Sequence, residues 1–466
     1  MKKRLVSVVL CAAMLCTALY VCYIPAQASA DPLKLLVISD THYGYGTSAI
    51  TDMMFGQLAN EAEYSGFDIV LISGDVTDHG AIGEHDALLA KLRALEAAGK
   101  QVYVVTADHD YKGGSSGYTG ASYERSQLAG LYADFGFGDA IAQFPGDNLN
   151  YVARLAPGYR LLVLNFDIMR AFTGEQFQWA LAQVQEAKSA GEQIIGMWHY
   201  PVLASLGVYQ FEQAGVVNDP GSFGRLADAG LRYGFSGHIH GQNIDYIKTK
   251  SGNLFYEITT ASSCKSPSSP IRKVTLGADG KMDIQTSYTR GEYDGVPIAA
   301  FLSNMQDGMT RGLLEGLELG GDELERRIYN AIGYVVEVSQ YERIIALLGK
   351  AMNSLTMGQL GWIFLCPWTV SRELRNVRLS EFLVDAVNSF FIGEKHACPW
   401  KSPQGRAFFA LARRLDLVFV PAAFLLRLFN RFELFGIELP ITSLTGFFKP
   451  FLYNPLSGND AALPHE

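Results

Sequence analysis

The sequence is poor in cysteine and in charge, and both shortages limit what the protein can be. Only six of the 466 residues are cysteine. Three of them lie in the apolar N-terminal stretch, so a disulfide scaffold is excluded. Charged residues make up 18% of the chain, and 38 basic residues face 47 acidic ones, which argues against a nucleic-acid-binding surface. The hydrophobic share of 48% over this length is enough for two or three folded domains.

The N-terminus has the pattern of an export signal. A basic start, Lys2-Lys3-Arg4, precedes an apolar stretch over residues 5–24, and small residues at 26–30 offer cleavage sites before Asp31. We therefore expect residues 1–30 to be a signal peptide and the mature protein to be extracellular or at the cell surface. An uncleaved membrane anchor is the alternative, because about 20 apolar residues can span a bilayer.

From residue 33 to about 290, short apolar runs alternate with segments of helical periodicity, which is typical of an α/β fold. The runs that predict buried strands are 35–39, 69–73, 102–106, 161–165 and 194–197. The segments that predict helices are 51–64, 84–98 and 175–190. After Gly241, four more β-type runs predict a second sheet: 244–247, 255–260, 271–276 and 284–288. Residues 111–145 form a candidate lid or substrate loop.

From about residue 293 the pattern becomes mostly helical, so we expect one domain over 31–292 and a second over 293–466. Residues 405–435 mix Phe and Leu with five arginines, which suits either peripheral contact with a membrane surface or packing on the first domain. The uncharged run 351–371 is interrupted by polar residues and proline, so we predict no transmembrane helix there. Cys366 and Cys398 each open a Cys-Pro-Trp tripeptide, and they form either a disulfide or two buried thiols.

Five apolar runs of the first domain end in groups that can bind metal. In chain order these ends are Asp40-Thr41-His42, Gly74-Asp75-Val76-Thr77-Asp78, Ala107-Asp108-His109-Asp110, Trp198-His199-Tyr200 and Gly237-His238-Ile239-His240. Each alone has a structural explanation, as a helix cap, a turn or a buried histidine. Their joint appearance favours a metal site, because consecutive strands of a parallel sheet end at one edge and would gather these side chains in one cleft. Without metals such a cluster would carry a heavy desolvation cost.

The ordered set of these motifs resembles the calcineurin-like metallophosphoesterases over residues 33 to about 290. The amino-acid sequence at 73–84 and at 175–179 is similar to the phosphodiesterase-like branch of that family. The resemblance implies a two-sheet α/β sandwich with α-β-β-α layers, followed here by the mostly helical domain. It also implies two divalent or mixed-valence metal ions (Mn, Fe or Zn) and a small phosphoester substrate.

By position, the resemblance implies roles for nine residues. Seven would bind metal: Asp40, His42 and His240 one ion, Asp108, His199 and His238 the other, and Asp75 both. His109 would act as the acid and Asp78 would orient it, while a metal-bound hydroxide attacks a phosphodiester or phosphomonoester.

The pair Ala107-Asp108 departs from the Gly-Asn that the family usually has. Alanine fits if the backbone there has a negative φ. A centre of two divalent ions, Asp40, Asp75 and a hydroxide keeps a positive net charge when the neighbouring ligand is a neutral asparagine. An ionised Asp108 would bring that net charge to zero. Such a centre should hold metals more tightly but attract an anionic phosphate less. Two alternatives remain: a lipid-headgroup phosphodiesterase at a membrane surface, and a non-catalytic metal-binding member of the family.

Other residues near the motifs are weaker candidates for the site. We expect His79 and His85 to be exposed rather than to touch substrate, and Asp110 to support its loop. The remaining weak candidates, for ring stacking or support, are Tyr43, Tyr45, Tyr111, Tyr118, Asn165 and Asp167.

Overall fold

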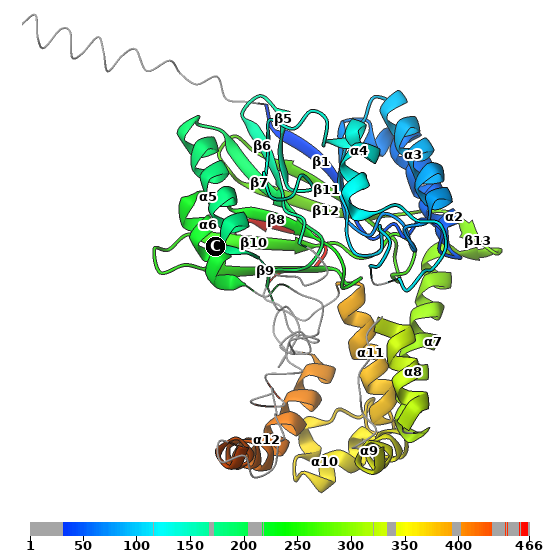
Figure 1. Cartoon of the computed structure of the whole chain (residues 1–466). Coiled ribbons are helices and arrows are strands. Elements are labelled where there is room, and N and C mark those ends of the chain that lie inside the picture. The colour runs from blue at the N-terminus through cyan, green and yellow to red at the C-terminus, as the bar shows by residue number, and fades with distance from the viewer. Residues whose placement is uncertain are drawn as a thin grey trace, which may run out of the picture.

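Two β-sheets lie face to face between two layers of helices, and a helical arm extends from one end of this sandwich (Figure 1). The computed structural model describes residues 31–114, 116–166, 172–203, 217, 219–319, 321–332, 342–393, 402–430, 443, 445, 456 and 458–464. The predicted signal peptide, Asp167 and Cys398 lie outside the described residues. The predicted α-β-β-α sandwich with a helical C-terminal region is confirmed.

The first sheet has the strand order β15-β12-β11-β1-β2-β3. Its parallel part consists of β1 (Leu33–Ile38), β2 (Ile69–Ser73) and β3 (Gln101–Val105). Its antiparallel part consists of β11 (Pro270–Leu276), β12 (Met282–Tyr288) and β15 (Ala461–Leu463). Nearly every residue of β1 and β2 is buried, as expected of parallel strands covered on both faces.

The second sheet has the order β4-β5-β6-β7-β8-β10-β9. Its strands are β4 (Ala142–Gln143), β5 (Tyr151–Ala156), β6 (Tyr159–Val163), β7 (Gln193–Met197), β8 (Tyr233–Ser236), β9 (Asn243–Lys248) and β10 (Leu254–Thr259). The prediction that the runs after Gly241 form a sheet of their own is therefore wrong. Strands β9 and β10 extend the second sheet, whereas β11 and β12 pair with the first.

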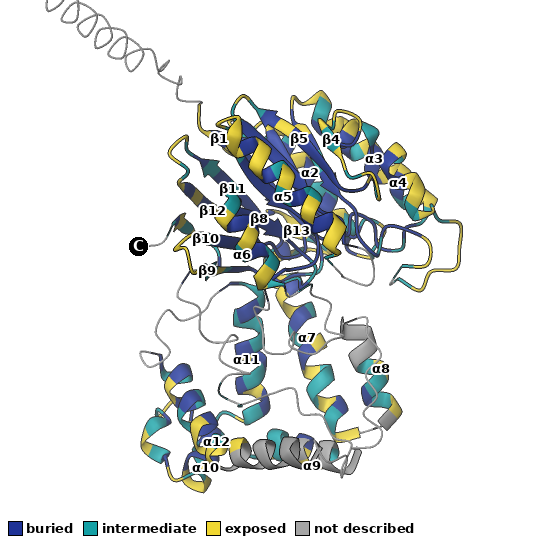
Figure 2. Ribbon diagram, turned by 60° about the vertical axis from the view of Figure 1, so that its left-hand side comes forward, coloured by how far each residue is buried: buried dark blue, intermediate teal, exposed yellow. Residues whose placement is uncertain are grey.

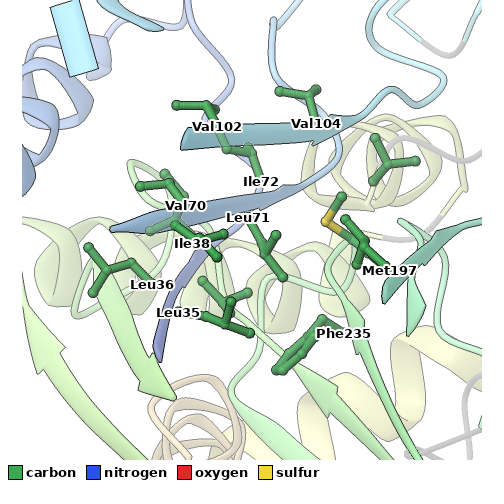
Figure 3. Packing of buried hydrophobic residues seen from close by; sticks show 14 of the residues in the cluster. Leu35, Leu36, Ile38, Val70, Leu71, Ile72, Val102, Val104, Met197 and Phe235 are labelled. Carbon is green, nitrogen blue, oxygen red and sulfur yellow. The ribbon is translucent and has the colours of Figure 1, made fainter. Parts of the chain in front are cut away.

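The core between the sheets consists of aliphatic side chains from both layers. Figure 3 shows Leu35 and Leu71 of the first sheet near Met197 and Phe235 of the second. The covering helices are α2 (Ser48–Asn60) and α3 (Ile82–Ala97) beside the first sheet, and α5 (Gly174–Ser189) and α6 (Pro220–Ala229) beside the second. This packing holds the carboxyl ends of β1, β2, β3, β7 and β8 in fixed relative positions.

The candidate lid is partly built into this core. It contains η2 (Arg125–Gln127), α4 (Leu128–Leu131), η3 (Ala133–Phe135) and β4. Tyr132, Phe135 and Phe137 from it are buried. Its mostly exposed residues fall in two stretches of the described part, 112–127 and 138–145, on either side of these buried rings, so residues 111–145 are not one continuous exposed loop.

The helical arm begins after the short hairpin of β13 (Glu292–Tyr293) and β14 (Val296–Pro297). Its helices are α7 (Ile298–Leu319), α8 (Gly321–Ile332), α9 (Glu342–Ser354), α10 (Met357–Ile363), α11 (Leu379–Phe391) and α12 (Pro403–Asn430). Helices α7 and α11 lead away from the sandwich, and α9, α10 and α12 lie at the far end (Figures 1 and 2). Among the described residues, no helix has both the length and the apolar character needed to span a membrane.

The far end of the arm has a small core of its own, with Met357, Leu360, Val370, Phe382 and Phe409 among its members. The uncharged run 351–371 is divided among α9, α10 and η6 (Pro367–Thr369), as expected of a segment that is not transmembrane. Cys366 is a free, buried thiol in this core.

The C-terminus returns from the arm to the sandwich, which the sequence did not predict. Strand β15 pairs with β12, and the buried Arg272 donates hydrogen bonds to the backbone carbonyls of Gly458 (2.9 Å) and Asn459 (3.1 Å). Asn459 also donates to the carbonyl of Ile392 at the end of α11 (2.9 Å). The C-terminal segment therefore connects the end of α11 to the sandwich.

Candidate metal centre

The five predicted motifs meet where strands of both sheets end. Asp40, Asp75 and the 107–110 loop follow β1, β2 and β3 of the first sheet, while His199 and the 237–241 loop follow β7 and β8 of the second. The expectation of one parallel sheet edge is therefore wrong in detail. Two sheet edges face each other, and the side chains converge from both.

Backbone geometry sets these residues apart from the rest of the chain. Of the eight non-glycine residues with positive φ in the described part, five are predicted ligands: Asp40 (48°), His42 (37°), Asp75 (43°), His238 (69°) and His240 (50°). Such conformations cost about 1–3 kcal/mol each and tend to occur at functional sites. Ala107 is not among the eight, so alanine causes no strain of this kind there.

Two glycines make room for the ligands. A Cβ atom on Gly74, which has φ +95°, would lie 2.4 Å from Nδ1 of His199. A Cβ atom on Gly237 would lie 2.4 Å from Oδ2 of Asp40. Glycine at these two positions therefore allows strands of different sheets to bring their ligands together.

The first ligand group consists of Asp40, His42 and His240. The Nε2 atoms of the two histidines lie 3.0 Å apart, and Nε2 of His240 lies 3.3 Å from Oδ1 of Asp40. Asp40 and His42 are buried, whereas His240 is partly exposed. This is the set predicted for one metal.

The second ligand group consists of Asp75, Asp108, His199 and His238. Nε2 of His199 lies 3.2 Å from both Oδ2 of Asp75 and Nδ1 of His238. Oδ2 of Asp75 also lies 3.8 Å from Nε2 of His42, a member of the first group. Asp75 therefore lies between the two groups, where a bridging ligand is required.

The donor set fits two metal ions. Within each group the ligand atoms lie within 4.8 Å of one another, and ligands bonded at about 2.0–2.2 Å to one ion have such separations. Two carboxylates and two imidazoles in the second group, and one carboxylate and two imidazoles in the first, suit manganese, iron or zinc. Asp108 belongs to the second group, so its carboxylate lies where it can bind the same ion as His199 and His238.

Neighbouring groups determine which nitrogen of His42 and His199 would face a metal ion. Nδ1 of His199 donates to the backbone carbonyl of Ser73 (2.9 Å), and Nδ1 of His42 lies 3.0 Å from Oδ1 of Asp78. In both residues Nε2 is left for the ligand position. Such partners orient a metal-binding imidazole and raise its basicity.

His109 is held by the backbone of Asp78 rather than by its side chain. Nδ1 of His109 donates to the carbonyl oxygen of Asp78 (2.6 Å), and the His109 ring lies edge-on to His42 at 4.9 Å between centroids. The carboxylate of Asp78 instead accepts a hydrogen bond from Nζ of Lys265 (2.7 Å). The predicted role of Asp78 therefore belongs to its main chain, and its side chain supports His42.

Lys265 is the residue of this site that the sequence did not reveal. It follows β10 and places its ammonium 4.3 Å from the centre of the Tyr45 ring, besides its contact with Asp78. It lies in a serine-rich loop, 187 positions after Asp78, with no motif around it. Only the fold brings this cation to the centre.

Neighbouring charges shift the pKa values of the predicted ligands and of His109. Burial would raise the pKa of Asp40, but His240 lowers it to about 2. Burial would lower the pKa of His199, but Asp75 raises it to about 10. Burial would likewise lower the pKa of His109, but Asp75 and Asp108 raise it above its ordinary value. Shifted pKa values of this kind, lowered for a carboxylate and raised for histidines, are typical of functional sites.

Asp110 supports its loop, as expected. Its carboxylate accepts hydrogen bonds from the backbone N–H of Thr77 (2.8 Å), the Thr77 hydroxyl (2.8 Å) and the backbone N–H of Ala107 (2.7 Å). It thereby ties the loop after β2 to the loop after β3. Asn165 has a similar role, donating to the carbonyl of Thr106 (2.7 Å).

The other weak candidates lie around the centre. Of the two histidines near the second motif, His79 is about 40% exposed, pairs with Glu84 and lies beside Tyr118. Tyr43 donates to Asp52 (2.9 Å), and Tyr111 is buried in the core. His85 is fully buried, so the expectation of an exposed side chain is wrong.

His85 makes stability depend on pH. Its Nδ1 lies 2.8 Å from the Tyr132 hydroxyl and its Nε2 lies 3.0 Å from the Asp110 carbonyl, and burial lowers its pKa from 6.5 to about 4. Between these pH values the unfolded chain binds a proton at His85 that the folded protein does not. The free energy of unfolding should therefore fall by about 3 kcal/mol as pH falls from 6.5 to 4. Urea unfolding of chelator-treated wild type and His85→Gln at pH 7 and pH 4 measures this. The difference in the free energy of unfolding between the two proteins should be smaller at pH 4 than at pH 7 by that amount. A difference in the free energy of unfolding that is the same at both pH values would contradict the lowered pKa of His85.

The sandwich is similar to one known protein family and, at low identity, to several solved structures. Residues 33–242 match the family model described as calcineurin-like phosphoesterase. A dimetal phosphatase from Danio rerio aligns with 15% identity over 56% of this chain and 97% of that chain, with a TM-score of 0.42. A purple acid phosphatase from yellow lupin (Lupinus luteus) seeds aligns with 12% identity over 56% of this chain and 52% of that chain, with a TM-score of 0.41. No curated protein matches the sequence.

Proposed function

We propose, from the premise that residues 33–242 belong to the calcineurin-like phosphoesterase family, that this protein is a metal-dependent phosphodiesterase. The observation that carries the proposal is the pair of ligand groups on either side of Asp75. Two divalent ions bound there would polarise a phosphoryl oxygen and acidify a water molecule. The sequence of the second motif, at residues 73–84, favours a phosphodiester as the substrate class.

The chain's own residues would position and protonate the substrate. Because the carbonyl of Asp78 accepts the Nδ1 proton of His109, Nε2 is the atom that can exchange a proton with a leaving oxygen. The partly exposed His240 and His109 lie on the accessible side of the centre, whereas Asp40, Asp75 and His199 are buried. A phosphoester would thus approach from the side of His109.

A chelation experiment tests the proposal. The purified protein is assayed with bis-p-nitrophenyl phosphate, cyclic nucleotides, glycerophosphodiesters, phospholipids and p-nitrophenyl phosphate, before and after chelator treatment and after adding Mn²⁺, Zn²⁺ or Fe²⁺. We expect diester hydrolysis that the chelator abolishes and added metal restores. Metal binding without hydrolysis of any substrate would instead support a non-catalytic protein.

Asp108→Asn should change metal affinity and rate in opposite directions. The buried carboxylate of Asp108 lies among the second ligand group, so its removal leaves a more positive centre. We expect metal affinity to fall by about ten-fold and kcat/KM at saturating metal to rise a few-fold. Metal titration and diester hydrolysis of both proteins measure this. Unchanged affinity would show that Asp108 is not a ligand.

Export is a further part of the proposal and rests on the N-terminal sequence alone. The basic start, the apolar stretch and the small residues before Asp31 support cleavage there. N-terminal sequencing of the protein recovered from the native host should give Asp31 as the first residue. An intact Met1 in the membrane fraction would favour the uncleaved anchor.

A further inference from the structure

The helical arm exposes large apolar side chains more fully than the described part of the sandwich does. Seven large hydrophobic side chains in the described part are more than half exposed, and all seven lie between residues 319 and 417. Four of them lie within seven residues of one another: Trp362 (72% exposed), Ile363 (57%), Leu365 (70%) and Trp368 (75%). Among the described residues of 31–292, the largest such value is the 47% of Ile141. We name residues 357–378, which contain α10 and η6, the arm tip.

The exposed residues are held outward by an ordered support. Leu360, Cys366 and Val370 alternate with them along the chain and are buried in the core of the arm. The backbone N–H of Cys366 donates to the carbonyl of Gly361 (2.7 Å), which closes the turn between α10 and η6. The two tryptophans therefore project from a folded turn that is anchored on its other side.

Leu365 has a conformation that does not suit a leucine. Its φ is +54°, in the left-handed region that favours glycine and costs other residues about 1–2 kcal/mol. Of the other seven non-glycine residues with positive φ in the described part, five are predicted ligands of the metal centre. A strained and exposed leucine between two exposed tryptophans indicates that the turn is shaped for contact with something apolar.

The charge beside these residues identifies the kind of partner. Arg372, Arg375 and Arg378 are exposed, and Glu373 is the one acidic residue of the arm tip. This excess of positive charge stands in a chain whose net charge is −9. Tryptophan places its ring at the boundary between lipid headgroups and chains, and arginine pairs with headgroup phosphates. A protein partner would be expected to cover the tryptophans with its own apolar groups, and nothing in that requires three arginines.

We propose that the arm tip is a binding surface for anionic phospholipid membranes. The tryptophans, Ile363 and Leu365 would enter the headgroup region, and the three arginines would lie over it. This surface is distinct from residues 405–435, in which the sequence suggested membrane contact. It lies at the end of the arm away from the sheets, and α7 alone has a length of about 33 Å. The proposal therefore concerns attachment and is independent of the phosphodiesterase activity.

Vesicle co-sedimentation tests the proposal. The chain from Asp31 onward, the expected mature form, is used because residues 5–24 would themselves enter a bilayer. Vesicles of phosphatidylcholine alone are compared with vesicles that also contain phosphatidylglycerol. We expect binding to the anionic vesicles that weakens with salt, and much weaker binding to the neutral ones.

Two variants separate the apolar and charged parts. Trp362→Ser/Trp368→Ser should lower the partition coefficient at least about ten-fold on anionic vesicles. Arg372→Gln/Arg375→Gln/Arg378→Gln should lower it about 100-fold on anionic vesicles and leave neutral vesicles unaffected. The matched control Ile141→Ser/Tyr246→Ser, which removes two exposed apolar side chains from the sandwich, should bind like wild type.

Folding and activity controls accompany these measurements. All variants should keep the wild-type melting temperature and diester hydrolysis, because the altered side chains are exposed and none belongs to a ligand group of the metal centre. Absence of hydrolysis in every protein would refute the proposed function and leave the membrane result valid. Failure of wild type to bind anionic vesicles, or equal binding by the tryptophan variant, would overturn the inference. A dimer that the tryptophan substitutions dissociate, without vesicle binding, would also overturn it and assign the arm tip to a second copy of the chain.

Discussion

Asp75→Asn should lower phosphodiester hydrolysis at least about 1,000-fold and reduce the number of bound metal ions. Asp75 lies 3.2 Å from Nε2 of His199 and 3.8 Å from Nε2 of His42, so its carboxylate faces both ligand groups. Asparagine has nearly the same shape but no charge, and it cannot offset two adjacent cations. Losing a bridging carboxylate removes several kcal/mol of transition-state stabilisation, which corresponds to this factor.

The matched control is Asp86→Asn, which changes an exposed aspartate on α3 that belongs to no ligand group. It should retain wild-type metal content and rate. Elemental analysis and steady-state kinetics of the three proteins give the result. An Asp75→Asn protein that keeps both metals and more than about a tenth of the activity would contradict the bridging assignment.

His109→Gln should lower kcat by about 100- to 10,000-fold while leaving metal content unchanged. The side chain is positioned by the carbonyl of Asp78 and stands next to His42. It belongs to neither of the two groups that meet at Asp75, although it forms a third possible metal-holding group with His42 and Asp78. If His109 protonates the leaving oxygen, the loss should be large for an alkyl leaving group. It should be much smaller for p-nitrophenolate, which needs no proton to depart.

The control for this variant is His79→Gln. His79 also follows β2 but is about 40% exposed and pairs with Glu84. We expect at most a few-fold change in kcat. Equal losses for both leaving groups in His109→Gln would mean that the residue binds the phosphoryl group rather than acting as the acid. Loss of metal in this variant would make it a ligand.

Much of the centre was predictable because its residues occur in short motifs after apolar runs. Asp40, Asp75 and His199 each lie two residues after the end of a buried strand, and that local pattern is visible without the fold. The motif order then identified the likeness to a known family. Strand existence was predictable for the same reason, since buried parallel strands are continuous apolar runs.

Strand partners and long-range contacts were not predictable in this way. The apolar pattern of β11 shows that it is buried, but the pattern is the same whichever sheet it joins. Strand β15 is three residues long and becomes a strand only by pairing with β12. Lys265 carries no local sign of its position, because its contact with Asp78 depends on how the loop after β10 folds back. His85 was misassigned because its burial comes from Tyr132, a residue of the segment predicted to be a lid.

The most direct test of this account is the metal content of the purified wild-type protein, measured by elemental analysis after metal loading and removal of excess ions. Two ligand groups that meet at Asp75 predict two ions of manganese, iron or zinc per chain. A protein that retains no such metal would contradict the account, because the carboxylates and imidazoles gathered at the two sheet edges would then have no ion to hold.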